Sequence, residues 1–550
     1  MKDSLRRDVE AWIARDPDAD DRDMLRALLD SDDEPELERH FGAPLTFGTA
    51  GLRGPEMAGP AGMNRATVRQ ATLGVLAWMR ETGADASRGI VVGRDGRRGS
   101  ERFNDEVVSV LLGGGVVVYE MPEALPTPLV AFCVKALRAA AGIMITASHN
   151  PPEDNGYKLY AGDGAQIVPP DDEIVERHMR DTLEAVLGER SSPLHSYVSE
   201  SVLADYRRHV VERFHAPDES ELAITYTPLH GVGGATMERL FGEAGFSTVS
   251  TVARQFEPDG SFPTLAFPNP EEPGALDLAM ETATAAHSAL IIANDPDADR
   301  LGAAVRDGST WRALRGDEIG WLLASSLVEG IRERGETMAT TIVSSTLLEK
   351  MAEAYDVPYV TTLTGFKWLA RSAGEGTLGF AYEEALGFAV DSNVSDKDGL
   401  SAALALATLT DDLIRRGSSL LERLDEIETR YGVHATTQLS IRADGPEGLG
   451  ELRQKVTDLT NRPPRELGGL TITESIELSR GFRGLLPTEG VWLGLGEMGR
   501  VVVRPSGTEA KVKAYVEVTP PRDGSLDEQR ALAKEITEQI LASLRELLSL

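Results

Sequence analysis

The chain has 550 residues, 41% of them hydrophobic and 26% charged, which is typical of soluble globular proteins and too long for a single hydrophobic core. Lysine and arginine number 56 against 88 aspartate and glutamate, so the net charge of −32 disfavours nucleic acid and anionic membranes as partners. A single cysteine, Cys133, excludes an internal disulfide. No apolar run approaches the roughly 18 residues of a membrane span, and the charged N-terminus lacks a signal-peptide pattern, so we expect a cytoplasmic protein.

The first part of the chain predicts helices followed by three segments of one design. Residues 4–40 have the apolar spacing of acidic amphipathic helices. After them, short β-branched runs alternate with helical patterns, which predicts βαβ units and mainly parallel sheets. The runs are 89–95, 115–120 and 142–151, then 222–231 and 289–300, then 339–345, 358–365 and 378–387. Because ligands gather beyond the carboxyl ends of strands in such sheets, we expect the closing loops to face one cleft.

The pattern changes near residue 430. Alternating runs at 434–444, 499–507 and 511–518 predict an antiparallel sheet, and helical stretches at 447–460 and 526–550 would cover one face. We therefore predict four domains around a central cleft, three of them similar α/β domains with mixed, mainly parallel sheets and the last an α+β domain. The predicted bounds are 1–205 for the helical lead with domain I, 206–312 for domain II, 313–428 for domain III and 429–550 for domain IV.

The segment Thr146–Pro152, TASHNPP, follows an apolar strand and ends in two prolines that keep a helix from starting there. A serine such as Ser148 is a poor nucleophile unless a neighbour removes its proton or stabilises its ester. His149 and Lys158 lie close enough in the sequence to do this. The alternative is an ordinary serine turn. The chain has no G-x-S-x-G here, which argues against an α/β-hydrolase.

A carboxylate loop follows another apolar strand. The segment DPDADR places Asp295, Asp297 and Asp299 at alternating positions, and carboxylate oxygens are the ligands that Mg²⁺ prefers. An EF-hand is excluded because its glycine position holds Arg300. The same string, DPDAD, occurs at Asp16–Asp20 among polar helical residues with no strand before it. We predict a metal site at the second copy and a solvated surface run at the first.

A basic loop lies near the C-terminus. The segment Arg504–Glu509, RPSGTE, follows a valine-rich strand, and Lys511 and Lys513 come soon after it. An arginine fork, two hydroxyls and the N–H groups around a glycine match the needs of a phosphate dianion. A hairpin turn with incidental basic residues is the alternative. Because the loop is cationic in a strongly anionic protein, we predict a phosphate site.

Three further motifs are less specific. The glycine-rich segment Phe47–Gly54, FGTAGLRG, is either a flexible connection or a loop that puts Arg53 near a phosphate. The segments Thr364–Trp368 and Tyr382–Phe388 combine a cation, acids and aromatics that suit sugar hydroxyls, but they also fit two ordinary loops. The segment Gly494–Gly499 matches G-x-G-x-x-G, but a strand-like run follows it where a dinucleotide site needs a helix.

Taken in order, the serine loop, DPDADR, EEALG and RPSGT resemble the four signature loops of the α-D-phosphohexomutase superfamily, from about residue 41 to the C-terminus. FGTAGLRG, TGFKW and YEEALG look most like its phosphoglucomutase/phosphopentomutase branch. The resemblance implies a mutase that interconverts sugar 1-phosphates and 6-phosphates, or 5-phosphates for pentoses, through a phosphoserine and a bisphosphate. Phosphoglucomutase with phosphopentomutase activity is the leading reading and phosphomannomutase the alternative. A phosphosugar phosphatase and a non-catalytic phosphosugar-binding protein are more remote.

The resemblance also implies roles for single residues. The catalytic residues would be Ser148, His149, Lys158 and Arg53, and one Mg²⁺ per chain would be held by Ser148, Asp295, Asp297 and Asp299. The substrate would be bound by Arg300, Lys367, Glu383, Ala385, Arg504, Ser506, Gly507, Thr508 and Lys513. Many members have serine at the position of Ala385, which leaves the sugar open. The implied partners are a small phosphosugar and a hexose 1,6-bisphosphate that acts as activator and intermediate, and the oligomeric state is left open between monomer and dimer.

Overall fold

The structure, a computed structural model, describes residues 1–47, 51–180, 184–218, 220–374, 376–442, 445–505 and 511–548. The chain divides into two compact units. The first comprises Met1–Leu314 and Gly387–Asp411, and the second comprises Arg315–Leu386 and Asp412–Leu550. Among the described residues, no helix combines the length and the apolar character needed to cross a membrane.

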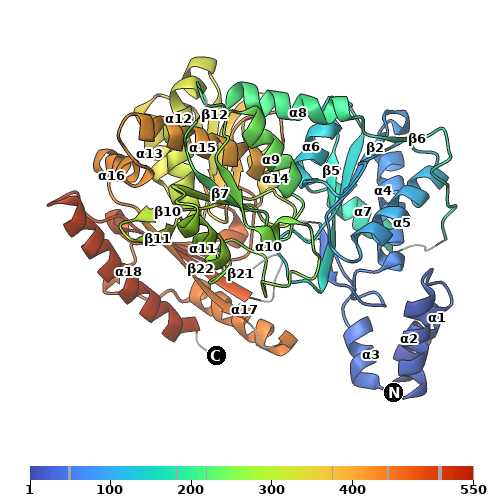
Figure 1. Ribbon diagram of the computed structural model, residues 1–550. Helices are drawn as coiled ribbons and strands as arrows, with labels where there is room; N and C mark the ends of the chain where they lie inside the picture. Colours follow the sequence, from blue (N-terminus) through green and yellow to red (C-terminus); the bar gives the residue numbers. More distant parts are fainter. Residues whose placement is uncertain are drawn as a thin grey trace. The chain divides into compact units, whose positions relative to one another are not determined.

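The first unit begins with three short helices that lie side by side at the N-terminal end (Figure 1). They are α1 (Asp3–Ile13), α2 (Ala19–Asp30) and α3 (Glu34–Phe41), which confirms the predicted helical lead. Asp18 and Asp33 cap the second and third helices by accepting backbone N–H groups. Their shared core is built from Val9, Trp12, Ile13, Leu25, Leu29 and Leu37.

The prediction of a solvated surface run at Asp16–Asp20 is wrong for two of its carboxylates. Asp16 is 3% exposed and Asp18 is 7% exposed. The Trp12 indole donates to Asp16 Oδ2 at 2.8 Å, and the Asp18 N–H donates to Asp16 Oδ1 at 2.9 Å. These acids therefore join the end of α1 to the start of α2, which a composition of polar residues alone does not reveal.

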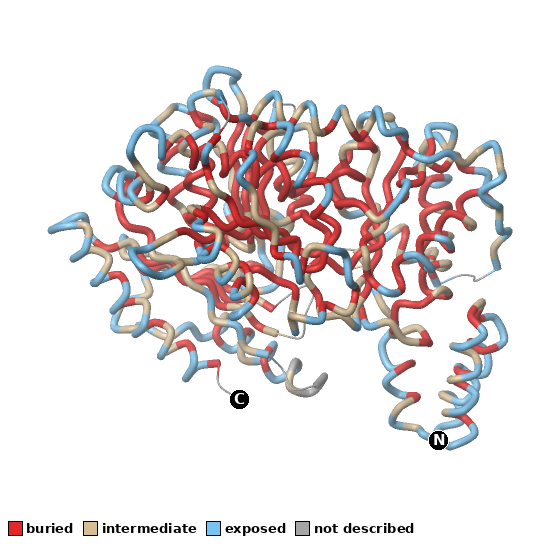
Figure 2. Tube along the Cα trace, viewed as in Figure 1, coloured by how far each residue is buried: buried red, intermediate tan, exposed pale blue. Residues whose placement is uncertain are grey.

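A six-stranded sheet follows in the order β1-β5-β4-β2-β3-β6. β4, β2, β3 and β6 run parallel, whereas β5 pairs antiparallel with both β4 and β1. The strands are β1 (Leu52–Pro55), β2 (Ile90–Arg94), β3 (Val118–Glu120), β4 (Ala141–Ile145), β5 (Asp154–Ala161) and β6 (His195–Tyr197). The helices of this region are α4 (Arg65–Thr82), η1 (Ala86–Arg88), α5 (Ser100–Gly113), α6 (Thr127–Ala136) and α7 (Asp171–Met179). Figure 2 shows the sheet interior buried and the helices exposed on their outer side.

A second mixed sheet completes most of this unit, in the order β11-β10-β9-β7-β8. β9, β7 and β8 are parallel, and β10 is antiparallel to both of its neighbours. The strands are β7 (Ile224–Thr227), β8 (Val249–Thr251), β9 (Leu290–Ala293), β10 (Gly302–Asp307) and β11 (Thr310–Ala313). The helices are α8 (Glu200–Arg213), α9 (Gly234–Glu243), α10 (Ala253–Phe256) and α11 (Asp277–Ala285). β15 (Gly387–Ala389) and most of α15 (Gly399–Arg415) are grouped with this unit.

The second unit contains a parallel set of strands and an antiparallel sheet. β12 (Thr337–Thr341) lies between β13 (Tyr359–Thr362) and β14 (Leu378–Glu383) and is parallel to both. The helices around them are α12 (Gly316–Arg334), α13 (Leu347–Ala354), α14 (Phe366–Leu369) and α16 (Leu420–Tyr431). This region follows the same α/β design as the two sheets of the first unit.

The C-terminal sheet has the order β16-β22-β21-β20-β19 and is antiparallel throughout. Its strands are β16 (Ala435–Arg442), β19 (Glu474–Glu477), β20 (Val491–Gly494), β21 (Gly499–Pro505) and β22 (Lys511–Val518), with a small pair β17 (Glu466–Leu467) and β18 (Leu470–Thr471). The helices are α17 (Gly445–Asn461), α18 (Leu526–Leu548), η2 (Leu478–Arg480) and η3 (Gly496–Met498). The predicted fold class, three mixed α/β regions and an antiparallel α+β region, is confirmed. The domain bounds at 205, 312 and 428 stay predictions.

Candidate active site

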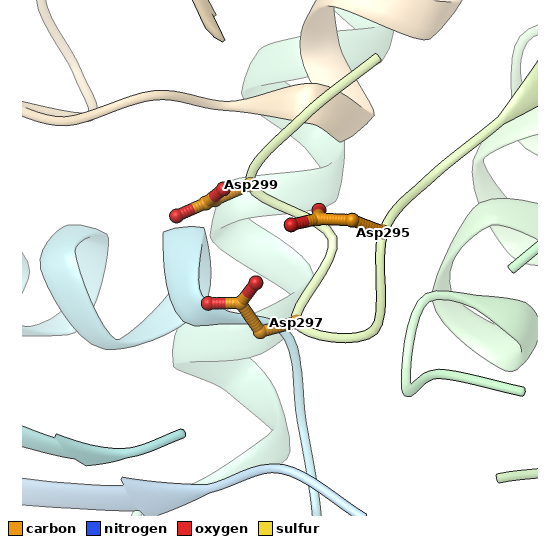
Figure 3. Close-up of side chains that lie close together, drawn as sticks. All are labelled: Asp295, Asp297 and Asp299. Carbon is orange, nitrogen blue, oxygen red and sulfur yellow. The ribbon is translucent and has the colours of Figure 1, made fainter. Parts of the chain in front are cut away.

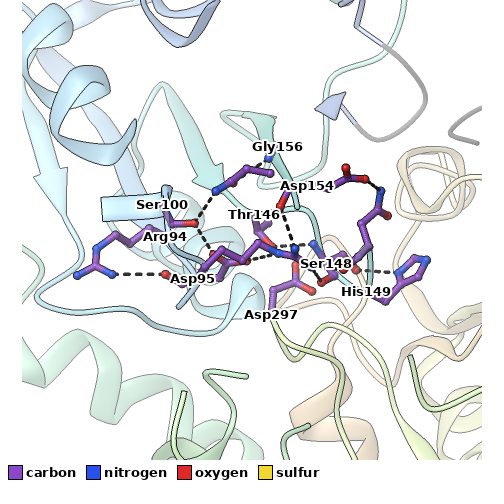
Figure 4. A network of polar contacts seen from close by, with 12 residues as sticks. Arg94, Asp95, Ser100, Thr146, Ser148, His149, Asp154, Gly156 and Asp297 are labelled. Carbon is purple, nitrogen blue, oxygen red and sulfur yellow. Dashed lines mark hydrogen bonds and ion pairs between the residues drawn. The ribbon is translucent and has the colours of Figure 1, made fainter. Parts of the chain in front are cut away.

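The serine loop leaves the carboxyl end of β4, whose residues are all buried. Ser148 is 2% exposed and has a φ of 54°, a left-handed conformation that is uncommon for a residue other than glycine. Its N–H donates to Thr146 Oγ1 at 2.9 Å, and this contact is part of the network in Figure 4. Strained backbone of this kind costs on the order of 1–3 kcal/mol and clusters at functional sites. The loop therefore presents one serine in a conformation that the surroundings must enforce.

The Ser148 hydroxyl joins two loops that are far apart in the sequence. Its Oγ donates to Asp295 Oδ2 at 2.8 Å, across 147 residues, and lies 3.2 Å from His149 Nδ1. Ser148 is thus within hydrogen-bond distance of two further residues that the sequence predicted for catalysis and metal binding.

The carboxylate loop follows β9 and carries three fully buried acids. Asp295, Asp297 and Asp299 are each 0% exposed, and Figure 3 shows their side chains converging. One carboxylate oxygen from each lies within 4.8 Å of the others, and no other group of three His, Cys, Asp or Glu side chains among the described residues meets this criterion. Ala298, with a φ of 56°, turns the backbone between the second and third acids. The Thr127 hydroxyl donates to Asp297 Oδ2 at 2.6 Å.

The three acids fit a hard divalent cation. Asp297 Oδ1 and Asp299 Oδ1 are buried, and no described residue hydrogen-bonds to them. Burying a carboxylate oxygen without a partner is costly, so a ligand that supplies the missing contact is expected. An all-oxygen donor set of this kind suits Mg²⁺ and suits softer metals less well.

Three cationic side chains surround the acids. Lys158, on β5, is 2% exposed, and its Nζ lies 2.7 Å from Asp297 Oδ2 and 2.7 Å from Asp299 Oδ2. Lys397 Nζ lies 3.2 Å from Asp299 Oδ2. Arg300 Nε lies 3.9 Å from Asp299 Oδ1, and the backbone N–H of Arg300 donates to Asp295 Oδ1 at 3.0 Å. Buried charges of both signs thus meet in one place, as buried ions require.

The charges of this cluster are unevenly distributed. Burial and the neighbouring Asp297 and Asp299 raise the pKa of Asp295 well above its usual range. Burial also opposes ionisation of Asp299, but Lys158 and Lys397 outweigh it and lower the pKa of Asp299. Burial lowers the pKa of Lys158, but Asp297 and Asp299 outweigh that effect and raise it, so this lysine is a cation. Asp299 is therefore ionised, whereas the protonated form is favoured at Asp295.

Arg53 reaches the serine loop from the edge strand β1. Its Nη1 donates to Asn150 Oδ1 at 2.9 Å, and its Nε is buried with no hydrogen-bond partner among the described residues. Burial lowers the pKa of Arg53, whereas nearby Asp297 opposes this shift. Arg53 therefore lies beside the serine loop, and the prediction that FGTAGLRG puts Arg53 near a phosphate stays a prediction. Residues 48–50 of that motif lie outside the described residues.

In the second unit, two motifs that were ambiguous in the sequence lie together. The Gly365 N–H donates to Glu383 Oε1 at 2.6 Å, which joins TGFKW to YEEALGF. Lys367 lies on the short helix α14 and is 8% exposed. Ala385 lies in the turn that follows β14 and is half-buried. The Ser344 hydroxyl donates to Glu384 Oε2 at 2.8 Å.

The two strands that flank the predicted phosphate loop, β21 and β22, also belong to the second unit. The register of β21 and β22 pairs Arg504 directly with Lys513. Burial, then Glu383 and Asp317, raise the pKa of Glu384 to about 7, while Lys513 opposes the shift. The predicted residues Ser506, Gly507 and Thr508 lie outside the described residues. Within the second unit, Lys513 is thus close enough to the predicted sugar loop to affect the charge of Glu384.

Sequence reasoning missed three buried charged residues. Asp95 and Arg97 follow β2, the strand next to β4 in the sheet, and they contact the serine loop and its supports. Their signal was available, because GRDGRR ends a buried strand as the two recognised loops do. Lys397 stands in the polar run SDKDG, and nothing in that pattern distinguishes it from a solvated segment.

Comparison with known proteins decides the family. The family models of phosphoglucomutase/phosphomannomutase α/β/α domains I, II and III match residues 44–185, 204–308 and 315–431. The model of the C-terminal domain of the same family matches residues 452–535. This chain belongs to the phosphoglucomutase/phosphomannomutase family, part of the α-D-phosphohexomutase superfamily. The predicted membership and enzyme class are confirmed, since the family consists of phosphotransferase isomerases.

Relatives within the family carry different substrate names. A probable phosphomannomutase of Haemophilus influenzae is 37% identical, and the match covers 88% of this chain and 98% of the length of that relative. The phosphopentomutase of Homo sapiens is 33% identical over 98% and 95%, and a phosphoglucomutase of Staphylococcus aureus is 31% identical over 94% and 96%. Among solved structures, a putative phosphomannomutase of Thermus thermophilus has the same fold, with a TM-score of 0.71, 23% identity and coverage of 92% and 99%.

Proposed function

We propose that this chain is a phosphosugar mutase that moves a phosphoryl group between two oxygens of one sugar through phosphorylated Ser148. The sugar 1-phosphate is interconverted with the 6-phosphate, or with the 5-phosphate when the sugar is a pentose. Glucose phosphates are the leading substrates, with pentose phosphates as further substrates. A hexose 1,6-bisphosphate serves as activator and intermediate.

One contact carries the proposal. Ser148 Oγ lies 2.8 Å from Asp295 Oδ2, so the hydroxyl that would be esterified stands at the edge of the acidic cluster. A phosphoryl group on Ser148 would extend beside Arg53, Lys158 and Arg300, whose positive charge suits the charge-spread transition state of phosphoryl transfer. An ordinary serine turn would not need a strained nucleophile, three buried acids and three cations in one place.

The reaction would proceed by two phosphoryl transfers. The bond between Ser148 Oγ and phosphorus breaks as a bond forms between phosphorus and a free hydroxyl oxygen of the sugar monophosphate, which gives the bisphosphate. The proton of that hydroxyl goes to a base. Of the two predicted acceptors, His149 is the candidate, because it lies 3.2 Å from Ser148 Oγ whereas Lys158 is already a cation. The bisphosphate then turns around. The bond between its other phosphorus and the sugar oxygen breaks as phosphorus bonds to Ser148 Oγ, and that sugar oxygen takes up the proton from the base.

Asp295, Asp297 and Asp299 would hold one Mg²⁺, with an oxygen of phosphorylated Ser148 as a further ligand. When bound, the ion neutralises charge on the transferring phosphoryl group. Other residues of the chain would hold these carboxylates in position. Thr127 orients Asp297 through a hydrogen bond of 2.6 Å, and Lys158 holds Asp297 and Asp299 at 2.7 Å each.

Residues of the second unit would bind the rest of the substrate. Glu383, held by the Gly365 N–H, would accept hydrogen bonds from sugar hydroxyls. Arg504 and Lys513, paired across β21 and β22, would bind the phosphate that is not being transferred. Such a site would contact mainly the phosphate dianion and little of the sugar, so it would accept either phosphate of the turning bisphosphate.

Substitution of the serine tests the proposal directly. Ser148→Ala should abolish mutase turnover while the circular dichroism spectrum and the thermal unfolding midpoint stay close to those of the wild type. Ser201→Ala, which changes an exposed serine of α8, is the matched control and should leave kcat/KM unchanged. Full activity in Ser148→Ala would reject the assignment.

Phosphomannomutase is the alternative, favoured by the 37% identity to the Haemophilus influenzae relative. Ala385 lacks a hydroxyl that many members supply, so this position gives no preference between sugars. Values of kcat/KM for glucose, mannose, ribose and deoxyribose 1-phosphates, primed with hexose 1,6-bisphosphate, would rank the substrates. Highest kcat/KM for mannose 1-phosphate would replace the leading proposal with the alternative.

The same assay separates the remote alternatives. A phosphatase would release inorganic phosphate in an amount that matches substrate loss. A binding protein would take up the phosphosugar without isomerising it. The proposal expects isomerisation with little phosphate released.

A further inference from the structure

Arg97 lies in the loop after β2, is 3% exposed, and has no place in the reaction as described so far. Its guanidinium forms a fork around the serine loop. Nη2 donates to the carbonyls of Ser148 at 2.7 Å and Asn150 at 2.6 Å, and Nη1 donates to those of Pro151 at 2.7 Å and Asp154 at 2.9 Å. Four backbone oxygens of one loop are therefore held by a single side chain.

The orientation of the guanidinium is itself fixed. Arg97 Nε lies 3.3 Å from Asp95 Oδ2, and Asp95 Oδ1 accepts the Arg97 N–H at 3.0 Å and the Ser100 hydroxyl at 2.5 Å. The contact at Nε is an ion pair and not a hydrogen bond. All of these groups are buried, so removing one partner would leave a charge or a polar group less well compensated. Arginine suits this place because its planar, always charged fork makes several parallel hydrogen bonds, which a lysine cannot reproduce.

The face of the same guanidinium contacts the part of the unit that carries the acids. The Arg97 guanidinium carbon lies 5.0 Å from the centre of the Phe262 ring. The nearby Asp259 N–H donates to His230 O at 2.9 Å, and two residues further along that loop the Val232 N–H donates to Pro296 O at 2.8 Å, within the carboxylate loop. The edge of Arg97 thus holds the serine loop, while its face packs on a segment tied to the carboxylate loop.

The conformation of Ser148 explains why such support is needed. A φ of 54° turns the Ser148 carbonyl out of any regular hydrogen-bonding pattern, and an unpaired buried carbonyl would be costly. Arg97 supplies the donor for that carbonyl. The distance of 2.8 Å between Ser148 Oγ and Asp295 Oδ2 depends on both loops keeping this arrangement.

We propose that Arg97 is a positioning residue for phosphoryl transfer, which holds Ser148 in its left-handed conformation and in register with the carboxylate loop. The inference rests on the proposed function. It assigns Arg97 no contact with the substrate. Since a displacement of about 1 Å can cost about 100-fold in rate, loss of the fork should slow the chemical step far more than it weakens binding.

The first measurement compares three variants of the full chain. Arg97→Lys keeps the charge but loses the fork, Phe262→Leu removes the ring under the guanidinium, and Arg98→Lys changes an exposed arginine of the same loop as the control. The rate of Ser148 phosphorylation by glucose 1,6-bisphosphate is followed by quenched-flow peptide mass spectrometry. We expect a fall of about 100-fold for Arg97→Lys, about 10-fold or less for Phe262→Leu and no change for Arg98→Lys.

Two further readouts separate positioning from simple loss of stability. The KM for the sugar monophosphate and the affinity for Mn²⁺, measured by electron paramagnetic resonance, should stay within about threefold of the wild type in Arg97→Lys. Added guanidinium at low millimolar concentration should partly restore the rate of Arg97→Ala, because the cation can occupy the emptied fork. Destabilisation alone predicts no rescue, since guanidinium weakens folding.

The outcomes are distinguishable. If the wild type forms phosphoserine at residue 148 and Arg97→Lys does so at the same rate, the inference is overturned and the proposed function stands. Equal falls in rate and Mn²⁺ affinity, without rescue by guanidinium, would also overturn it, because they would indicate general damage to the fold. If the wild type forms no phosphoserine at residue 148, both the inference and the proposed function fail.

Discussion

The string DPDAD occurs twice in the first unit, and the two copies have different surroundings. At Asp16–Asp20 the carboxylates of Asp16 and Asp18 accept hydrogen bonds from backbone N–H groups and from the Trp12 indole, within 2.8–3.1 Å. At Asp295–Asp299 the acids converge, and two of their oxygens are buried without hydrogen-bond partners among the described residues. Asp16 and Asp18 are buried although Asp20 is exposed, so burial alone does not distinguish these two acids from those of the second copy, which are all buried.

The difference lies in what the carboxylates face. In the first copy, backbone N–H groups and the Trp12 indole donate to the acids, Arg102 pairs with Asp18 at 3.4 Å, and the result is a helix cap. In the second copy, Lys158, Lys397 and Arg300 balance the acids, and oxygens remain for a ligand. Identical local sequence therefore has different surroundings in the two places, because Lys158 of β5, Arg300 and Lys397 gather around the second copy.

The largest effect is expected from a substitution in the second copy, Asp295–Asp299. Asp297→Asn removes the central carboxylate charge and should lower kcat/KM by about 1000-fold, as the loss of a main electrostatic group does. Affinity for Mn²⁺ should fall by at least about 10-fold in isothermal titration calorimetry. The control is Asp18→Asn, the corresponding position of the first copy, which should leave both quantities unchanged. Equal effects of the two substitutions would contradict the distinction between the copies.

A smaller effect comes from removing one cation beside the second copy. Lys397→Met takes away the ammonium group 3.2 Å from Asp299 Oδ2, and kcat should fall about 10- to 100-fold. Affinity for Mn²⁺ should hold or rise, because one positive charge near the acids is gone. Lys135→Met, which alters a lysine bonded to the same segment at Ser395, is the control and should retain activity. Weaker Mn²⁺ binding by Lys397→Met would show that the lysine supports the site in another way.

The first copy should respond in stability and not in activity. Asp18→Ala removes the cap of α2, where Asp18 Oδ1 accepts the Asp20 N–H at 3.1 Å, and should lower the free energy of unfolding by about 1 kcal/mol. Urea unfolding followed by circular dichroism measures this change. The kcat/KM value should stay at the wild-type level. A large fall in activity would mean that the N-terminal helices contribute to catalysis.

The smallest expected effect is a pH dependence beside the first copy. Burial, then Asp16 and Asp18, raise the pKa of Asp21 to about 6 from an ordinary value of 3.8. The folded state therefore binds more protons than the unfolded state between these values, so the contribution of Asp21 to stability is lost as pH rises through that range.

Asp21→Asn should remove this loss. The variant should unfold at a higher temperature than the wild type at about pH 8, and the difference should shrink towards zero at about pH 4. Differential scanning calorimetry at both pH values measures it. An unchanged difference across this range would show that Asp21 ionises normally in the folded protein.

Much of the fold follows from sequence pattern. The buried runs at 142–151 and 289–300 predicted β4 and β9, and the loops after them hold Ser148 and Asp295. Strand order was not readable, however, because the pairing of β2 with β4 depends on contacts between distant residues. For that reason the loop that follows β2 was overlooked.

The remaining errors have a similar cause. The burial of Asp16 depends on the Trp12 indole, four residues away on a helix whose packing the local composition does not specify. Lys397 reaches Asp299 only because the segment Gly387–Asp411 returns to the first unit. The roles of the site residues, the oligomeric state and the location in the cell stay predictions.

The central claim is that Ser148 carries the phosphoryl group. Peptide mass spectrometry of the wild type, incubated with hexose 1,6-bisphosphate and Mg²⁺, tests it most directly. We predict one phosphoryl group on Ser148 that is lost when excess sugar monophosphate is added, with formation of bisphosphate. A chain that turns over substrate with Ser148 unmodified, or with the phosphoryl group on another residue, would contradict the account.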